Sequence, residues 1–529
     1  MDTGLHGEKV LLNVILTKCV PHQSIRIEAR KGERLSEALW LSGRLAVSAL
    51  CSGLGHCGAC RVRFLKDAPE ATEEESVDLG AEAVADGWRL SCRHCVRSEA
   101  WLSVPAEPAE CSGGGVPGAA AGDGAEALLA VDLGTTSIQW RALCPDGRTL
   151  AEGGMLNPQL AAGSDVMSRI AMACTGEGAG RLRAPVVGAL RRIAAGVPGG
   201  VRELCVAGNP AMTAILAGKA CSGLSAAPYQ LAEEGGRAMR IEGLPPLWLP
   251  DQIAPFVGGD ISSGMLWLLE QQPQFPFLLA DMGTNGEFVL AFDESHALAA
   301  SVPLGPALEG IGLSCGTNAG PGSIVGFDMA PDGLKCRFWE NAGSRAEGIA
   351  GTGYLSLIAL LLREGVLLAS GQPAKDALSP LARRLLALLR RDGQGAWRFE
   401  LPHGMCLTAH DVEAVLKVRA AFAMAAGQLT RAAGLHPENV CWYLAGALGW
   451  HAPRAALEQL GFIPAGLGAR VRSIGNASLN GACLLLCRPE LRERMRQWKR
   501  GCAVLDLTSL PDAESLYVQE MRFQAMRQC

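Results

Sequence analysis

The sequence predicts a multidomain protein of the α/β and α+β classes, with a small β-rich domain, a linker and a longer region built from two similar halves. Three observations support this. Apolar and polar residues alternate over short stretches of residues 9–105, the composition changes to Pro, Ala, Gly and Ser over residues 106–126, and two similar segments begin at residues 128 and 278. Because 529 residues exceed one ordinary core, we expect two to four domains.

The first domain has the pattern of a β-grasp module. Two strands are followed by a helix, a third strand, an acidic helical stretch and a closing strand, at residues 10–16, 24–29, 35–41, 61–65, 68–86 and 101–104. The acidic stretch contains Glu73, Glu74 and Glu75. We interpret them as an exposed, solubilising face, with docking of a basic reductase as the alternative.

A cysteine loop lies between the helix and the third strand of this domain. Cys51, Cys57 and Cys60 lie in a glycine-rich segment, and Cys92 follows within Arg-Leu-Ser-Cys. Glycines let such a loop turn three thiolates toward one centre while a distant strand end supplies the fourth, as a [2Fe–2S] cluster requires. The spacing therefore predicts a carrier of single electrons.

Structural zinc is the alternative for these cysteines, because zinc favours paired Cys-x2-Cys knuckles and Cys92 and Cys95 form a second pair. The longer first spacing and the glycines favour the cluster, which leaves Cys95 as a packed or spare thiol. The chain has 19 cysteines, and its first residues lack the basic and then apolar pattern of an export signal. We therefore expect reduced thiols and a cytoplasmic protein.

The segment rich in Pro, Ala, Gly and Ser cannot bury a core and is predicted to be a flexible tether. It sets the expected domain boundaries. We expect the iron–sulfur domain over residues 1–106, the linker over 107–126, the first half of the duplicated region over 127–275, and the second half with a C-terminal extension over 276–529.

Each of the two similar segments has an apolar run, an Asp, a Gly, hydroxyl or amide residues and another apolar run. A strand that ends in Asp, a tight turn and a returning strand can hold phosphate through the turn, while the Asp positions Mg²⁺ or a water. We predict this role for Asp132 and Asp281, in two hairpins that together clamp the phosphates of a nucleotide. The predicted phosphate contacts are Gly134, Thr135, Thr136, Gly283, Thr284, Asn285 and Gly286.

Three further residues belong to the predicted nucleotide site. Glu287 follows the second turn and can orient the attacking water, with a structural strand-end carboxylate as an equal alternative. Gly446 and Gly449 follow an apolar strand, where glycine lets a backbone approach a purine or ribose.

With these motifs, the chain resembles a known family, the reductive activators of corrinoid proteins. The further supporting stretches are residues 157–170, 206–212, 256–261 and 305–316, the last of which contains Glu309 and Cys315. The resemblance covers nearly the whole chain. It implies a ferredoxin-like domain joined to a duplicated, ribonuclease-H-like ATPase of the superfamily that includes acetate kinase, sugar kinases, heat-shock chaperones and actin.

The resemblance also implies a function: one electron passes from the cluster to Co(II) of a corrinoid methyl carrier and restores Co(I). The Co(II)/Co(I) couple of such proteins lies below the potential of a typical ferredoxin-like cluster, and each ~59 mV of this difference lowers the equilibrium constant of electron transfer about tenfold. ATP is the expected source of the missing free energy. The implied cofactors are [2Fe–2S], ATP and Mg²⁺, and the implied partners are a corrinoid protein and a low-potential electron donor, with a homodimer as a candidate assembly. None of the nine histidines lies in an Asp-x-His-x-x-Gly signature, so we expect the corrinoid to belong to the partner.

The composition argues against other partners. A net charge of −5, a pI near 6.1 and the lack of a basic arm count against nucleic acid. The longest apolar runs are interrupted by charges well short of a membrane span, so we expect no membrane insertion.

Three rival functions stay open from the sequence. One is an activator of radical dehydratases or benzoyl-CoA-type reductases, against which the fused cysteine domain counts. Another is a small-molecule kinase with an appended electron module. The third is an ATP-gated binding protein whose cluster only senses redox state.

Overall fold

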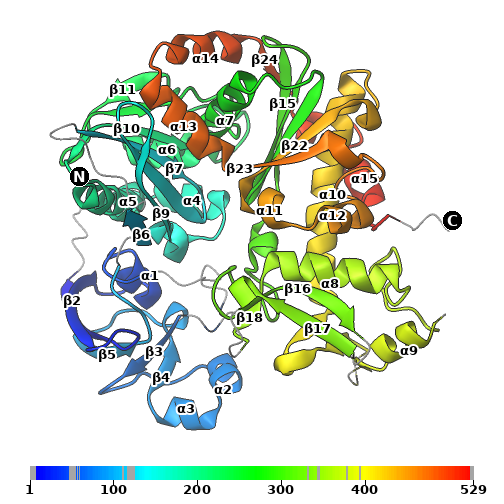
Figure 1. Ribbon diagram of the computed structural model, residues 1–529. Helices are drawn as coiled ribbons and strands as arrows, with labels where there is room; N and C mark the ends of the chain where they lie inside the picture. Colours follow the sequence, from blue (N-terminus) through cyan, green and yellow to red (C-terminus); the bar gives the residue numbers. More distant parts are fainter. Residues whose placement is uncertain are drawn as a thin grey trace. The chain divides into compact units, whose positions relative to one another are not determined.

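The structure is a computed structural model, and it describes residues 8–46, 55, 58, 60–109, 112–115, 126–330, 333–341, 346–376, 379–391, 393 and 395–524. The chain forms two compact units (Figure 1). The first consists of residues 1–260 and 481–492, and the second of residues 261–480 and 493–529. The polypeptide therefore passes from one unit to the other more than once.

A five-stranded sheet forms the first domain, in the order β2-β1-β5-β3-β4. Its strands are β1 (Lys9–Leu16), β2 (Gln23–Arg30), β3 (Arg61–Phe64), β4 (Trp88–Leu90) and β5 (Ala100–Val104). The helices are α1 (Leu35–Trp40), α2 (Glu73–Leu79) and α3 (Ala81–Ala85). β1 pairs with β2 in antiparallel and with β5 in parallel orientation, which confirms the predicted β-grasp arrangement. The sequence missed β4, because a three-residue strand is too short to show alternation.

The core of this domain follows from the alternation in β1. Leu12, Val14 and Leu16 are buried, and they belong to the same core cluster as Leu39 and Trp40 of α1. Alternate side chains of a strand point to one face, so this face of β1 meets the helix while the other face carries more polar residues. Cys60, the last cysteine of the predicted cluster loop, immediately precedes β3.

A seven-stranded sheet forms the rest of the first unit, in the order β11-β12-β10-β7-β8-β9-β6. Its strands are β6 (Ser112–Gly115), β7 (Ala127–Leu133), β8 (Ser137–Leu143), β9 (Thr149–Leu156), β10 (Val201–Gly208), β11 (Arg237–Met239) and β12 (Leu247–Leu249). The helices of this part are α4 (Val166–Ala173), α5 (Gly178–Gly196), α6 (Pro210–Ala217) and α13 (Ala477–Cys487), which enters from the second unit. β7 is buried along nearly its whole length, as is typical of a central strand.

Part of the predicted tether is a strand. β6 pairs with β9 in antiparallel register, from Ser112 opposite Gly154 to Gly115 opposite Ala151. The prediction of an unstructured tether is therefore wrong for these four residues. Glycines contribute no side chain, and sequence patterns give no signal for a strand whose pairing depends only on its backbone.

The β-grasp domain contacts α5 within the first unit. Arg181 of α5 places one guanidinium nitrogen 2.9 Å from Glu33 and another 3.3 Å from Glu37, and Arg30 pairs with Glu177. These side chains are partly exposed. Arg30 and Glu177 are the exposed pair, and an exposed ion pair contributes only about 0–1 kcal/mol.

A six-stranded sheet is the centre of the second unit, in the order β23-β22-β13-β14-β15-β24. Its strands are β13 (Phe277–Met282), β14 (Asn285–Ala291), β15 (Ala297–Pro303), β22 (Cys441–Ala445), β23 (Val471–Gly475) and β24 (Cys502–Val504). Figure 1 shows the orange β22 and β23 beside green strands that come much earlier in the chain. The helices of this unit are α7 (Gly259–Glu270), α8 (Gly351–Arg363), α9 (Pro380–Leu386), α10 (Ala409–Ala432), α11 (Gly446–His451), α12 (Arg454–Leu460), α14 (Leu491–Arg500) and α15 (Ala513–Gln519).

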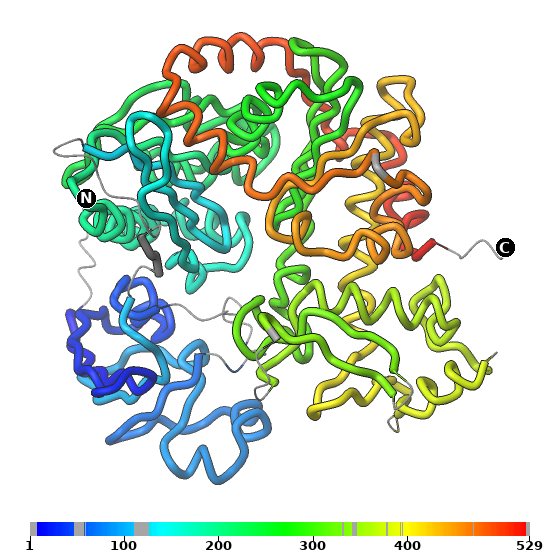
Figure 2. The backbone as a smooth tube through the Cα atoms, viewed as in Figure 1, coloured from blue at the N-terminus to red at the C-terminus, as the bar shows by residue number. Residues whose placement is uncertain are grey.

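Two small sheets complete the second unit. They have the orders β17-β16-β18 and β19-β20-β21. Their strands are β16 (Ser323–Ala330), β17 (Gly333–Phe338), β18 (Gly348–Ile349), β19 (Leu389–Arg391), β20 (Trp397–Glu400) and β21 (Cys406–Thr408). α8 packs on β16, and the tube in Figure 2 shows the two segments lying together. This packing is close, because a Cβ on Gly353 would lie 2.4 Å from the carbonyl oxygen of Ile324.

The two large sheets repeat one topology, which confirms the predicted duplication. In each, three antiparallel strands (β7-β8-β9 and β13-β14-β15) are followed by two strands parallel to the first of them (β10 and β12, and β22 and β23). This order is that of a ribonuclease-H-like fold, so the expected actin-type architecture is present twice.

None of the helices within the described ranges combines the length and the apolar character needed to cross a membrane.

Candidate functional site

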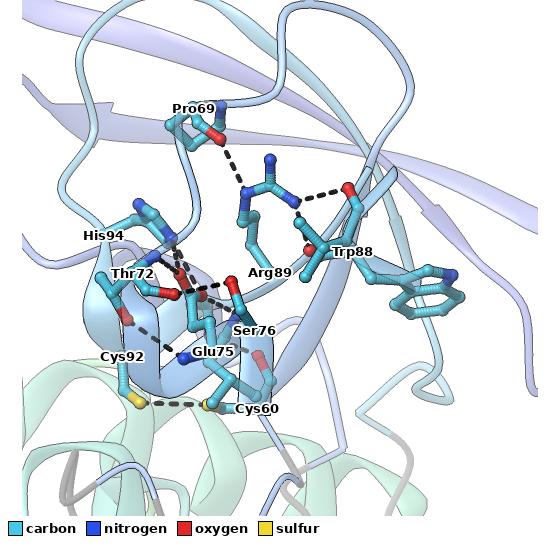
Figure 3. A network of polar contacts seen from close by, with 12 residues as sticks. Cys60, Pro69, Thr72, Glu75, Ser76, Trp88, Arg89, Cys92 and His94 are labelled. Carbon is cyan, nitrogen blue, oxygen red and sulfur yellow. Dashed lines mark hydrogen bonds and ion pairs between the residues drawn. The ribbon is translucent and has the colours of Figure 1, made fainter. Parts of the chain in front are cut away.

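Cys60 and Cys92 bring two predicted cluster ligands together. Their sulfur atoms lie 3.3 Å apart, and both side chains are buried (Figure 3). Two sulfurs bound to one metal at about 2.3 Å each are roughly 3.8 Å apart in a tetrahedral site. The two thiols are therefore close to the separation that a shared iron would require, and they fit a metal–thiolate centre.

The backbone around these cysteines is held by short hydrogen bonds. The carbonyl oxygen of Cys60 accepts from the N–H of Ser91 at 3.0 Å and from its hydroxyl at 2.7 Å. Cys60 immediately precedes β3, and Cys92 lies in the turn after β4, whose residues pair with β3. The sheet therefore fixes both sulfurs, although 32 positions separate them in the chain.

Glu75 lies behind this turn rather than on the surface. Its carboxylate accepts from the N–H of Leu90 at 2.6 Å and lies 2.9 Å from Nε2 of His94, and its side chain is fully buried (Figure 3). It also closes a capping box with Thr72 at the start of α2. The prediction of an exposed acidic face is therefore wrong for Glu75. A buried carboxylate requires such partners, and its distant partners cannot be read from local composition.

Glu74, the neighbour of Glu75, does remain on the surface. The hydrogen bond to its own backbone N–H, followed by that of the Thr72 hydroxyl, lowers the pKa of Glu74. The two neighbours therefore differ in role. Glu74 is an exposed charge at the N-terminus of α2, and Glu75 is a buried carboxylate that holds the segment around Cys92.

The other two predicted cluster ligands, Cys51 and Cys57, lie outside the described residues. Gly55 and Gly58 of the same loop have φ values of 81° and 61°, which favour glycine and agree with the predicted turning loop. Cys95 is exposed, which is contrary to the packed alternative, and its role as a spare thiol stays a prediction.

The first predicted phosphate turn joins β7 to β8. Asp132 stands near the end of β7, half-buried, and the turn contains Gly134, Thr135 and Thr136. Two buried asparagines brace this turn: Asn209 donates to the Thr135 hydroxyl at 3.0 Å, and Asn157 donates to the Gly134 carbonyl at 2.8 Å. Asn209 also caps α6 by accepting from the N–H of Met212.

The second predicted turn joins β13 to β14. Gly283 and Thr284 form the turn, whereas Asn285 and Gly286 are the first residues of β14, and the N–H of Gly283 donates to the Asn285 carbonyl at 3.1 Å. The Thr284 hydroxyl donates to Glu309 at 2.8 Å, and the carbonyl oxygen of Thr284 accepts from the N–H of Gly305. A carboxylate therefore holds the hydroxyl of this turn, where an amide holds that of the first.

Asp281 and Glu287 face one another across the second hairpin. They are directly paired in the register of β13 and β14, which puts both side chains on one face of the sheet. Asp281 is half-buried and Glu287 is 6% exposed. Paired carboxylates on one face can bind a divalent cation through oxygen atoms or orient a water.

Gly446 lies against the same carboxylate. Its φ is 79°, and a Cβ at this position would lie 2.6 Å from Oδ1 of Asp281. Gly449 is buried within α11, where a Cβ would lie 3.0 Å from the carbonyl carbon of Leu444. The structure thus brings Gly446 to Asp281, whereas Gly449 lets α11 pack closely against Leu444 near the end of β22.

Three residues that hold the predicted turns had no such role from the sequence: Asn157, Asn209 and Glu309. Each contacts the backbone or the hydroxyl of a predicted phosphate residue that is distant in the chain, and the only sequence signal was the place of all three in the stretches that resemble the family. Glu75 lies outside those stretches, and its contacts with Leu90 and His94 had no sequence signal.

Comparison with known proteins assigns all three parts of the chain. Residues 20–97 match the family model of the 2Fe-2S iron-sulfur cluster binding domain, residues 128–270 match that of the RACo middle region, and residues 276–528 match that of the C-terminal domain of RACo, the ASKHA domain. The first match supports the iron–sulfur cluster over zinc, and the third supports ATP binding.

Two curated proteins and one solved structure are similar over long stretches. The corrinoid activation enzyme RamQ of Eubacterium limosum is 28% identical over 423 residues, which span 75% of this chain and 70% of that protein. A [Co(II) methylated amine-specific corrinoid protein] reductase of Methanosarcina barkeri is 27% identical over 257 residues, or 44% of this chain and 42% of that protein. The solved structure of a reductive activator for a corrinoid, iron-sulfur protein has the same fold, with a TM-score of 0.66 and 20% identity over 97% of this chain and 98% of its own.

Proposed function

Because the chain belongs to the reductive activators of corrinoid proteins, we propose that it passes one electron to the Co(II) state of a corrinoid methyl-carrier protein and uses ATP to drive the transfer. The product is Co(I), the state that accepts a methyl group. The observation that carries the proposal is the union, in one chain, of a cluster domain and a duplicated phosphate-turn fold, in a protein similar to enzymes named for corrinoid activation.

The cluster domain delivers the electron. Cys51, Cys57, Cys60 and Cys92 would hold the [2Fe–2S] cluster, which supplies a one-electron carrier when bound. The close approach of Cys60 to Cys92 supports this ligand set. Ser91 and Glu75 keep the Cys92 turn in place through the hydrogen bonds described above.

The duplicated region binds and hydrolyses ATP. In this proposal the turns around Thr135 and Thr284 contact the phosphates of one nucleotide, and Asp132 and Asp281 position Mg²⁺ or its waters. Glu287 orients the attacking water, which its place opposite Asp281 supports. Gly446 gives the Asp281 carboxylate the room that this role requires.

The proposal includes movement of the cluster domain between a low-potential electron donor and the cobalt. The exposed ion pair of Arg30 with Glu177 supports such movement, because little free energy opposes its separation. ATP binding or hydrolysis would favour the productive arrangement of activator and corrinoid protein. A homodimer stays a prediction from the resemblance.

The decisive experiment mixes the reduced protein with a Co(II) corrinoid methyl carrier, with and without MgATP, and follows the cobalt absorbance anaerobically. We expect Co(I) only with MgATP. Cys60→Ser should abolish cobalt reduction and leave ATP binding intact, since the cysteine and the nucleotide turns are in different domains. Cys95→Ser is the matched control, because Cys95 is an exposed thiol near Cys92.

Failure to form Co(I) or its methylated product with several carriers, despite an intact cluster and bound nucleotide, would overturn the proposal. ATP-dependent phosphorylation of an added sugar or acid would favour the kinase instead. A cluster that no corrinoid protein oxidises, even with MgATP, would favour the redox-sensing binding protein.

A further inference from the structure

Two thiols of the second unit lie together although they are 91 residues apart in the chain. The sulfur of Cys315, in the loop after β15, is 3.6 Å from the sulfur of Cys406 at the start of β21. Both side chains are partly buried, and neither is among the cluster ligands. A disulfide bond has an S–S length of about 2.05 Å, so the sulfurs need to close by only about 1.5 Å.

The backbones that carry the two thiols are fixed by separate contacts. The N–H of Cys315 donates to the Tyr354 hydroxyl at 3.0 Å, and its carbonyl accepts from the N–H of Ile349 at 2.7 Å. Cys406 is paired with Glu400 in the small sheet of β19, β20 and β21. The short distance between the sulfurs is therefore set by two ordered segments.

The surroundings distinguish the two sulfurs chemically. The backbone N–H of Cys406 donates to the sulfur of Cys315 at 3.3 Å. Burial, and then the neighbouring Cys315, raises the pKa of Cys406. These contacts suit Cys315 as the sulfur that an oxidant attacks first and Cys406 as the thiol that resolves it.

The Cys315 segment is also joined to the second phosphate turn. Ser314 donates its N–H to the buried carboxylate of Asp411 at 2.7 Å, and its hydroxyl lies 3.0 Å from that of Thr408. Six residues before Cys315, Glu309 accepts the hydrogen bond of the Thr284 hydroxyl. A shift of this segment therefore acts on a side chain that holds the predicted phosphate contact.

We propose that Cys315 and Cys406 are a reversible redox site, in which a two-electron oxidant such as a peroxide converts the two thiols to an intramolecular disulfide and slows ATP hydrolysis. The peroxide oxidises the Cys315 sulfur to a sulfenic acid and releases one water. The Cys406 sulfur then forms the S–S bond and displaces the second water, so that two thiols and one peroxide give one disulfide and two waters. A thiol reductant restores the pair.

The effect on ATP hydrolysis rests on the proposed nucleotide site, whereas formation of the disulfide does not. Closing the S–S bond draws the Cys315 loop toward β21 and away from the position in which Glu309 holds Thr284. We expect ATP turnover to fall by about fivefold, the change in rate that corresponds to ~1 kcal/mol.

The test uses the full-length protein, treated anaerobically with diamide and then with an alkylating reagent. Trypsin leaves each thiol in a peptide of its own, residues 241–335 for Cys315 and 399–417 for Cys406, so mass spectrometry can identify their cross-link. We expect this linked pair after diamide and its loss after dithiothreitol, with ATP turnover falling and recovering in parallel. Cys406→Ser should keep its turnover in diamide, and Cys336→Ser, which changes another partly buried thiol, should respond as the unmodified protein does.

Alkylation of both peptides after diamide, without the cross-link, would overturn the redox site. A cross-link without loss of turnover, or equal loss in Cys406→Ser, would overturn its effect on ATP hydrolysis. A protein that hydrolyses ATP and forms the disulfide but never reduces cobalt would contradict the proposed function alone.

Discussion

The two hairpins of the duplicated region share a backbone and differ in charge. In the first, Asp132 is paired with Gln139, and in the second, Asp281 is paired with Glu287. The turn hydroxyls differ in the same sense, because Thr135 accepts from the amide of Asn209 while Thr284 donates to the carboxylate of Glu309. The first hairpin is thus supported by neutral amides and the second by acids.

The parallel strand beside each Asp, β10 in the first half and β22 in the second, shows the same asymmetry. Ala207 is paired with Asp132 and Ala445 with Asp281, and a glycine follows each alanine. A Cβ on Gly208 would meet the backbone carbonyl of Leu133 at 2.8 Å, whereas a Cβ on Gly446 would meet the carboxylate of Asp281 at 2.6 Å. The two halves therefore share the geometry of the strands and the turn, and the carboxylates suited to proton and cation chemistry are concentrated in the second.

The largest effect expected from this comparison is that of Glu287→Gln. Removing the charge while keeping the shape should lower ATP turnover by about a hundredfold, within the usual range for a group that orients or deprotonates a water. Nucleotide affinity should change little. A steady-state ATPase assay and titration with a fluorescent nucleotide measure the two quantities. Gln139→Ala is the matched change in the first hairpin and should keep ATP turnover within about threefold of the unmodified protein. Equal losses of turnover in both variants would contradict the proposed difference between the two hairpins.

Gly446→Ala should have the next largest effect, about a tenfold loss of turnover. The added methyl group displaces the Asp281 carboxylate, and the positive φ costs ~1 kcal/mol in addition. Gly208→Ala should instead lower the free energy of unfolding, by about 1–3 kcal/mol, because a backbone carbonyl must move. Turnover and urea denaturation of both variants test this, and a purely structural loss in Gly446→Ala would contradict a role for Asp281.

Glu309→Gln should weaken ATP binding by about fivefold. An amide oxygen can still accept from the Thr284 hydroxyl, but hydrogen bonds to a charged group are stronger by ~1 kcal/mol. Isothermal titration with a non-hydrolysable nucleotide measures the change. Unchanged affinity in both Glu309→Gln and Glu309→Ala would show that the carboxylate does not hold the turn for nucleotide.

Asn209→Ala should have the smallest effect on turnover and a measurable effect on stability. It removes the α6 cap and the contact with Thr135 from a buried position, which costs about 1–3 kcal/mol in the free energy of unfolding. Asn209→Ser, which keeps a capping oxygen, should recover part of this loss. A loss of ATP affinity in Asn209→Ala greater than that in Glu309→Gln would reverse the proposed ranking of the hairpins.

The local features were predictable because their signals lie within a few residues. The alternation in β1, the cysteine loop and the two Asp-containing turns each depend on the chain over one turn or strand, and the matches to the iron–sulfur and ASKHA families confirm the domains to which they belong. The strand pairs around Asp132 and Asp281 also follow from the repeated pattern. The individual nucleotide contacts stay predictions.

The incorrect expectations concern residues whose partners are distant in the chain. Glu75 belongs to an acidic run that reads as solvent-exposed, but its hydrogen bonds to Leu90 and His94 make burial favourable. The glycines of β6 read as a tether, but β9 provides backbone partners and makes β6 the edge strand of the seven-stranded sheet. Neither partner is visible in the composition of the segment itself.

By itself, the sequence determined the family and the kinds of domain, and it predicted thiolates for the cluster and two Asp-containing turns for phosphate. Only the tertiary structure decided which side chains support them, because the pairing of strands brings Glu287 opposite Asp281 and loop packing brings Glu309 to Thr284 and Cys315 to Cys406. Spacing along a chain fixes local geometry. Contacts across 25 to 91 residues depend on the packing of whole elements.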